Sequence, residues 1–148
     1  MHLALYQPAI PPNTGNIGRL CVGLGAHLHL IGPIGFDLSE HSRRRAGLDY
    51  WSDLDWTLHD DPDAFLQWLG DRAPWLITKH GTHRFDRIDY QADDVLILGN
   101  ENTGLPDTWH QRWTDRRIFI PIHGPVRSFN LANAAAIVLA QATVRTRD

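Results

Sequence analysis

Three short segments of this 148-residue chain carry polar groups of the kinds that perform chemistry. They are residues 11–19 (PPNTGNIGR), 98–106 (LGNENTGLP) and 127–131 (RSFNL). Within them lie the guanidinium of Arg19, the carboxylate of Glu101, the hydroxyl of Ser128 and the amide of Asn130. Such groups can bind a phosphate or a hydroxyl and stabilise the charge that develops when the hydroxyl reacts. The three segments are therefore the candidate functional site.

Each polar segment follows an apolar run typical of a buried strand, at residues 3–6, 95–98 and 118–122. Two of the segments lead into helical periodicity, which indicates βαβ crossovers and a parallel sheet. The carboxyl ends of parallel strands meet at one edge of a sheet, where open α/β sheets bind ligands. We therefore expect the three segments to lie together at that edge.

The elements that must position these segments follow from the same periodicities. Strands are predicted near residues 2–7, 27–31, 74–78, 94–98 and 117–122. The first helix has an apolar face that includes Ile17, Cys21 and Leu24, and Asn13 or Thr14 is expected to cap it.

Three further helices are expected. One begins after Pro62 and another begins at Pro106, since proline suits the first turn of a helix. The last helix, about Leu131 to Val144, is apolar nearly all round. A helix without a polar face must be covered on both sides, and in so small a protein the second cover is expected to be another subunit. The sequence thus predicts a homodimer.

Length and composition fit one α/β domain spanning residues 1–148, because 43% hydrophobic residues suffice for one core. We expect no membrane partner, since no apolar stretch approaches about 20 residues. We also expect no signal peptide, since the amino terminus has neither a basic region nor a long apolar region. Cys21 is the only cysteine, which excludes an internal disulfide and indicates a reducing cytoplasm. The net charge of −3 argues mildly against a nucleic-acid partner, so we expect no DNA partner, and an RNA-binding role must rest on local clusters such as residues 43–45.

The three polar segments, in this order and spacing, resemble the SPOUT class of RNA 2′-O-ribose methyltransferases. Within that class, residues 5–16 (LYQPAIPPNTGN) and 44–51 (RRAGLDYW) resemble the group that methylates the wobble nucleotide 34 of tRNA-Leu. The resemblance covers essentially the whole chain. It implies a parallel-sheet α/β domain with a deep carboxyl-terminal trefoil knot, a homodimer, S-adenosylmethionine as cofactor and a tRNA substrate, with cytidine or a modified uridine at the wobble position.

The resemblance also implies roles for individual residues. Arg19, Glu101, Ser128 and Asn130 match the catalytic positions, where Arg19 either takes the 2′-hydroxyl proton or stabilises the forming alkoxide. From the sequence alone, Arg19 can also be interpreted as a solvated arginine opposite the apolar face of its helix. Glu101 can also be interpreted as an ion-pair partner or as a cap of the helix that begins at Pro106. Ser128 or Asn130 could each be only the N-cap of the last helix. Asn100 stands where the wobble group would have proline.

By the same resemblance, Leu76, Gly99, Ile120 and Ser128 match positions that contact S-adenosylmethionine, largely through backbone. Leu76 and Ile120 are equally explained as core residues at strand ends. The run Arg43, Arg44 and Arg45 could be an ordinary solvated face or a phosphate clamp for RNA, with Lys79 as a weaker addition. The nine histidines show no ligand-like spacing, so no metal is expected.

Two other functions remain open at this point. One is a non-catalytic RNA-binding or cofactor-binding module of the same fold, although the joint presence of Arg19, Glu101, Ser128 and Asn130 argues against it. Methylation of another RNA site is a variant of the main hypothesis. The other is a Rossmann-type nucleotide enzyme, but residues 11–15 (PPNTG) lack the Gly-x-Gly-x-x-Gly turn that such enzymes place after the first strand.

Overall fold

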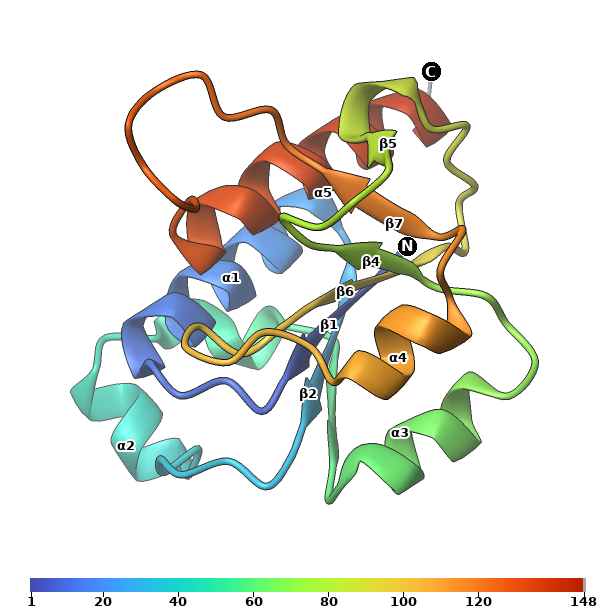
Figure 1. The fold of residues 1–148 in the computed structure, drawn as a ribbon. Helices are drawn as coiled ribbons and strands as arrows, with labels where there is room; N and C mark the ends of the chain where they lie inside the picture. Colours follow the sequence, from blue (N-terminus) through green and yellow to red (C-terminus); the bar gives the residue numbers. More distant parts are fainter. Residues whose placement is uncertain (148) are drawn as a thin grey trace.

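Seven parallel strands form a single sheet in the computed structural model (Figure 1), which describes residues 1–147 without the side chain of His41. The strands are β1 (His2–Tyr6), β2 (His27–Ile31), β3 (Trp56–His59), β4 (Trp75–Ile77), β5 (His83–Arg84), β6 (Val95–Leu98) and β7 (Arg117–Phe119). The helices are α1 (Pro11–Leu24), α2 (Glu40–Arg45), α3 (Pro62–Leu69), α4 (Asp107–Arg112) and α5 (Leu131–Arg147), with short 3₁₀ helices η1 (Asp49–Asp53) and η2 (Phe85–Arg87). The last residue of the expected domain, Asp148, lies outside the described residues.

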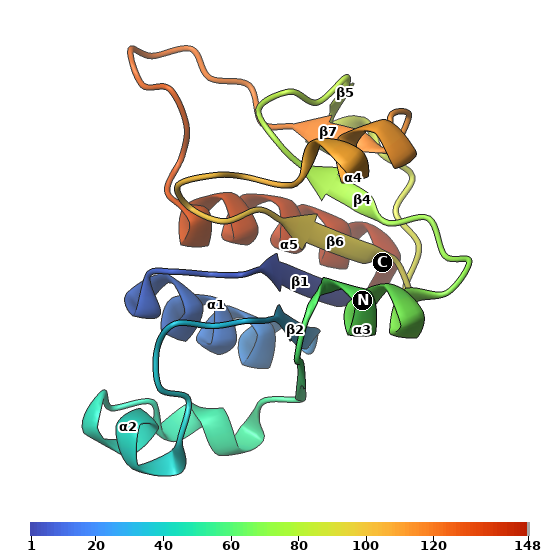
Figure 2. The same cartoon turned by 60° about the horizontal axis from the view of Figure 1, so that its bottom comes forward.

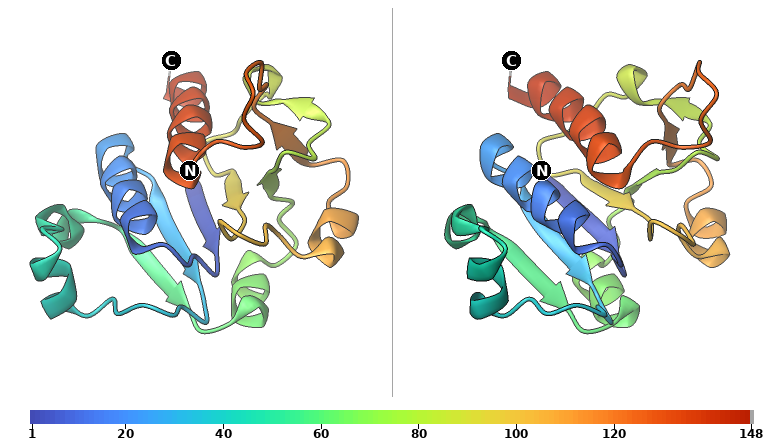
Figure 3. Two further views of the ribbon diagram at one scale, coloured as in Figure 1. Left: turned by 60° about the vertical axis from the view of Figure 1, so that its left-hand side comes forward. Right: turned by 90° about the vertical axis from the view of Figure 1, so that its left-hand side faces the viewer.

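Helices cover both faces of the sheet (Figure 3). Alternating side chains divide the core into two layers, one on each face. In β1, Leu3 and Leu5 pack with α1 and α5, whereas Ala4 packs with α3 and α4. Strands covered on both faces need apolar residues at nearly every position, which is why these strands appear in the sequence as continuous apolar runs.

The strand order is β3-β2-β1-β6-β4-β7-β5, so β6 enters the centre of the sheet after β4 and β5 have been placed outside it. The chain then returns to insert β7 between β4 and β5 before α5 packs against α1. The expected carboxyl-terminal trefoil knot stays a prediction. The α/β fold with a parallel sheet is confirmed.

Two short strands and one helix cap differ from the sequence-based expectations. β3 and β5 were not predicted, because β3 is only partly buried and β5 has two exposed residues at the sheet edge. α1 begins at Pro11, and its N-cap residue is Ile10, without a side-chain hydrogen bond. The prediction that Asn13 or Thr14 caps α1 is therefore wrong. Both lie inside the helix, where two leading prolines remove N–H groups that a cap would satisfy.

The remaining helix predictions hold with small shifts. α3 begins at Pro62, and Pro106 is the N-cap residue of α4 rather than its first residue. α5 extends three residues beyond the predicted end, to Arg147. Among the described helices, none is both long enough and apolar enough to cross a membrane.

Candidate active site

A cavity of 730 Å³ lies at the carboxyl edge of the sheet, where the loops after β4, β6 and β7 meet the beginning of α5. Figure 2 shows the loops after β6 and β7 leaving the sheet on the side where α1 and α5 begin. The cavity wall includes apolar groups from strand ends and polar groups from the loops: Ile77, Lys79, Leu98, Gly99, Asn100, Glu101, His110, Ile120, Ser128 and Asn130. The size falls within the range of sites for small molecules.

Six of the residues singled out in the sequence line this cavity: Gly99, Glu101, Ile120, Ser128, Asn130 and Lys79. Leu76 is fully buried in β4, one residue before Ile77, and contributes to the core behind the cavity wall. Arg19 and the run of residues 43–45 do not line it. The roles assigned to all of these residues stay predictions.

A chain of hydrogen bonds joins the three polar segments. The Glu101 carboxylate accepts the backbone N–H of Ala9 at 2.8 Å and of Ile10 at 3.2 Å, and the Asn13 amide at 3.4 Å. Asn13 Oδ1 in turn accepts the side-chain N–H of Asn130 at 3.0 Å. Glu101 thus fixes the entry to α1 from a position about ninety residues away in sequence, which explains how α1 begins without a cap of its own.

Asn130 has a second role at the start of α5. Its Oδ1 accepts the backbone N–H of Ala132 at 2.9 Å and of Asn133 at 3.3 Å, so Asn130 is the residue that caps the helix. Ser128 is exposed beside it and is free to present its hydroxyl to the cavity. Asn130 therefore both caps α5 and forms part of the cavity wall.

The loop after β6 is held in a tight turn that leaves no room for a side chain at Gly99. Asn100 and Gly104 exchange two backbone hydrogen bonds, of 3.1 and 2.9 Å. The Asn100 side chain donates to the carbonyl of Gln7 at 2.6 Å and accepts from Asn102 N–H at 2.8 Å. Asn100, which departs from the proline of the wobble group, thus ties this loop to the end of β1.

His110 and Asn13 are cavity residues that the sequence did not identify as such. Burial, assisted by the nearby charge of Arg117, lowers the pKa of His110, so its imidazole is neutral near pH 7. Its Nδ1 is buried without a hydrogen-bond partner among the described residues. The sequence around α4 does not indicate that His110 lines a cavity, because His110 reaches the cavity only when α4 packs against the sheet.

Arg19 projects into solvent from the exposed side of α1, with its guanidinium 6.0 Å from the ring centre of Tyr50. Among the three arginines of α2, Arg43 is half-buried, 5.8 Å from the ring centres of both Trp51 and Trp56. Arg44 and Arg45 are exposed, and Arg44 pairs with Glu40 at 2.7 Å on the helix surface. Arg44 and Arg45 are thus the members of this run that an external phosphate can reach.

Residues 1–140 match the SpoU rRNA Methylase family. The chain belongs to this family. A relative from Methylovorus glucosotrophus, named tRNA (cytidine(34)-2′-O)-methyltransferase, is 40% identical over 141 residues, which cover 95% of this chain and 92% of the relative. The family that the sequence resembles is therefore confirmed.

Solved structures of SpoU-type enzymes have the same fold. A structure described as giving "Structural insights into the 2-OH methylation of C/U34 on tRNA" superposes with a TM-score of 0.89 at 41% identity, covering 97% of this chain and 94% of that one. The SpoU methyltransferase AviRb from Streptomyces viridochromogenes, in complex with the cofactor AdoMet, superposes with a TM-score of 0.81 at 26% identity; 97% of this chain matches 59% of that longer one.

Proposed function

We propose that this protein transfers a methyl group from S-adenosylmethionine to the ribose 2′-hydroxyl of nucleotide 34, the wobble nucleotide, of a tRNA. The observation that carries the proposal is the convergence of the three polar segments on one cavity, within a chain that is about 40% identical over nearly its full length to cytidine-34 methyltransferases. We take residues 1–148 as a single catalytic domain acting in the cytoplasm, where tRNA is modified.

The cavity fits the cofactor in size and in the chemistry of its wall. S-adenosylmethionine, when bound, supplies the electrophilic methyl group, so the protein must position the two reactants and stabilise charge. Ile77, Leu98 and Ile120 offer an apolar surface, and the backbone of Gly99 forms part of the cavity wall. Ser128 and Asn130 add polar groups to the cavity wall, and Asn13 links Asn130 to Glu101 by hydrogen bonds.

We propose that Arg19 acts in a neighbouring subunit. It is exposed and does not line the cavity of its own chain, yet it lies on α1, which packs against α5. Packing of two copies through α1 and α5 would bring the partner subunit's Arg19 toward the cavity and cover the apolar loop residues Val126 and Phe129, which are 56% and 37% exposed. The active site we propose is therefore completed by dimerisation.

The proposed dimer can be tested by substituting residues on the side of α5 that is accessible to solvent. Ala135 is fully buried within its own protomer, so a charge there would damage the core, whereas Ile137 is partly exposed and Val144 is 58% exposed. We expect Ile137→Glu to shift the protein from dimer to monomer in sedimentation velocity, because burying an unpaired charge at a contact costs several kcal/mol.

The matched control is Leu58→Glu, which places the same charge on the exposed edge strand β3, where Leu58 is 46% exposed. It should sediment as the wild type does. Methyl transfer should fall with the dimer in Ile137→Glu only. A folded wild-type monomer at micromolar concentration would contradict the proposed assembly.

For the RNA, we propose that Arg44 and Arg45 contact tRNA phosphates, with Arg43 bracing α2 against the tryptophans and Lys79 acting at the cavity rim. Leucine isoacceptors are the proposed substrates. This choice rests on the resemblance of residues 5–16 and 44–51 to the tRNA-Leu group.

The deciding experiment is incubation of the purified protein with S-adenosylmethionine and unmodified tRNA transcripts, followed by nuclease digestion and mass spectrometry. We expect a 2′-O-methyl group at nucleotide 34 of tRNA-Leu and none in a transcript whose nucleotide 34 carries a 2′-deoxyribose. Calorimetry should show binding of S-adenosylmethionine and competition by S-adenosylhomocysteine. Methylation at another position would redirect the substrate assignment, and cofactor binding without methylation would favour a non-catalytic module.

A further inference from the structure

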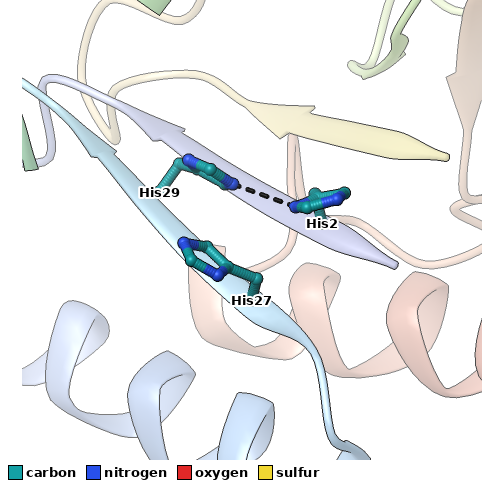
Figure 4. Close-up of side chains that lie close together, drawn as sticks. All are labelled: His2, His27 and His29. Atoms are coloured by element: carbon teal, nitrogen blue, oxygen red, sulfur yellow. Dashed lines mark hydrogen bonds between the residues drawn. The ribbon is translucent and has the colours of Figure 1, made fainter. Parts of the chain in front are cut away.

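Four histidines gather on the opposite side of the molecule, on the face of the sheet covered by α3. Strand pairing places His2 of β1 directly beside His27 of β2, and His29 lies two residues farther along the same face of β2. Figure 4 shows the rings of His2, His27 and His29 side by side on these two strands. His59 of β3 lies next to His29. The methyl-transfer site uses none of them.

From this geometry we infer that His2, His27 and His29 form a binding site for a divalent transition metal ion, with Zn²⁺ as the ion we commit to. Each residue offers a ring nitrogen within 4.8 Å of the nitrogens of the other two. Among the described residues, this is the group of three metal-binding side chains that meets this condition. Zinc bonds of about 2.0–2.1 Å place two tetrahedral nitrogen ligands about 3.3 Å apart, so small rotations of the rings suffice.

The outer hydrogen bonds orient the rings as they do around bound metals. His29 Nδ1 lies 2.9 Å from His59 Nε2, and His27 Nδ1 lies 2.9 Å from an Asp55 carboxylate oxygen. With Nδ1 engaged in this way, Nε2 of both His27 and His29 is the nitrogen left for a ligand bond. A histidine ligand commonly donates its other ring N–H to a carboxylate or another acceptor, which fixes the tautomer.

The metal would replace two existing hydrogen bonds. His2 Nδ1 lies 3.0 Å from His29 Nε2, and His27 Nε2 lies 2.8 Å from the Thr57 hydroxyl. When His2 moves its proton to Nε2, its Nδ1 and the His29 Nε2 both point lone pairs at the space between them, and no proton is released. The Thr57 hydroxyl can turn away to leave His27 Nε2 free.

His2 and His29 are held in the neutral form that binds a metal ion. Burial is the main cause that lowers the pKa of His29 to about 2 and that of His2 to about 4; neighbouring histidines contribute to both values, and the charged amino terminus contributes at His2. Neutral rings with free lone pairs are what a metal ion requires. Trp68 of α3 covers His29, with 4.0 Å between ring centres, while His2 and His27 are partly exposed and leave a path of entry. Three ligands leave one position of a tetrahedral ion for water.

The test is binding of Zn²⁺ to untagged, EDTA-treated protein, measured by competition with a chromophoric chelator. We expect one Zn²⁺ per protomer, a rise in the unfolding temperature with Zn²⁺, and the visible bands of tetrahedral coordination when Co²⁺ is used. His2→Gln and His27→Gln should each weaken Zn²⁺ binding at least tenfold, and Asp55→Asn should weaken it about tenfold. His83→Gln, which removes an exposed histidine of β5, should bind as the wild type does.

His2 and His27 are partly exposed, so both variants are expected to fold, and circular dichroism checks this. If one of them does not fold, the other decides. The inference is overturned if the wild type fails to bind one equivalent of Zn²⁺ even when Zn²⁺ is in 100-fold excess over the protein. It is also overturned if His83→Gln loses as much affinity as the two cluster variants. Because the cluster and the cavity lie at opposite edges of the sheet, EDTA-treated enzyme should retain methyl transfer. Loss of methyl transfer on EDTA treatment would contradict a separate site.

Discussion

Arg19→Ala is expected to lower the single-turnover rate of methyl transfer about 10²-fold or more, with tRNA saturating, while the fold and the affinity for S-adenosylmethionine stay near wild type. The magnitude is that typical of losing an acid–base or charge-stabilising group. The affinity should be spared because Arg19 does not line the cavity of its own chain. The fold should be spared because the side chain is exposed and its guanidinium lies 6.0 Å from the ring centre of Tyr50.

Arg19→Lys should restore little activity, because lysine keeps the charge but loses the planar fork of donors. Arg44→Ala is the contrasting variant: it removes an exposed guanidinium from α2, and we expect a raised tRNA KM and a weaker salt dependence with the rate at saturation unchanged. If Arg19→Ala transfers methyl groups at the wild-type rate once tRNA saturates, Arg19 is a binding residue only.

Mixing two inactive proteins tests whether Arg19 acts across the subunits. An Arg19→Ala protomer retains an intact cavity, and a protomer altered in the cavity retains Arg19. If the partner subunit's Arg19 completes each site, heterodimers of the two variants should regain up to half of the wild-type activity per dimer. Recovery would fail if both groups must come from one chain.

The parts of the fold that the sequence predicts best are those that are buried on both faces. β1 and β6 are covered by helices on both sides, so each contains a run of apolar residues that is visible in the sequence. β5 is two exposed residues that pair with β7 at the sheet edge, and nothing in the local sequence reflects that pairing. Its formation depends on tertiary structure alone.

The candidate site was predictable as three segments but not as a network. As expected, the carboxyl ends of parallel strands bring Gly99, Glu101 and Asn130 to one cavity. The sequence does not reveal that Glu101, and not Asn13 or Thr14, accepts hydrogen bonds from the backbone at the start of α1, because the contact spans about ninety residues of sequence. The amide of Asn13 instead bridges Glu101 to Asn130.

The histidine cluster could not be predicted from the sequence for a related reason. Along the chain, His2, His27, His29 and His59 have no spacing typical of a metal site. They converge only when the parallel register sets His2 beside His27 and when β3, which was not predicted, joins the sheet. The His-x-His pattern in the run at residues 27–31 was the available signal, since alternate residues of a strand share one face.

Gly99→Ala is expected to abolish measurable S-adenosylmethionine binding and to reduce the free energy of unfolding by about 1–3 kcal/mol, the cost of forcing extra atoms into a packed site. A Cβ at residue 99 would lie 2.5 Å from the Gly104 carbonyl carbon and 2.7 Å from both Gly104 Cα and Leu105 N. These are backbone atoms held by the paired hydrogen bonds between Asn100 and Gly104, so they cannot yield as the end of a flexible side chain could.

Relief of that clash must open the turn, and the turn carries Glu101. Its carboxylate would then leave the N–H groups of Ala9 and Ile10, and the start of α1 would lose the contacts that hold it against the cavity. Gly35→Ala is the matched control, because a Cβ there meets nothing within 4 Å and its φ is not in the left-handed region. Calorimetry with S-adenosylmethionine and thermal unfolding should both separate the two variants. If Gly99→Ala binds the cofactor as tightly as Gly35→Ala does, the loop after β6 adapts freely and the cavity is not built on its close turn.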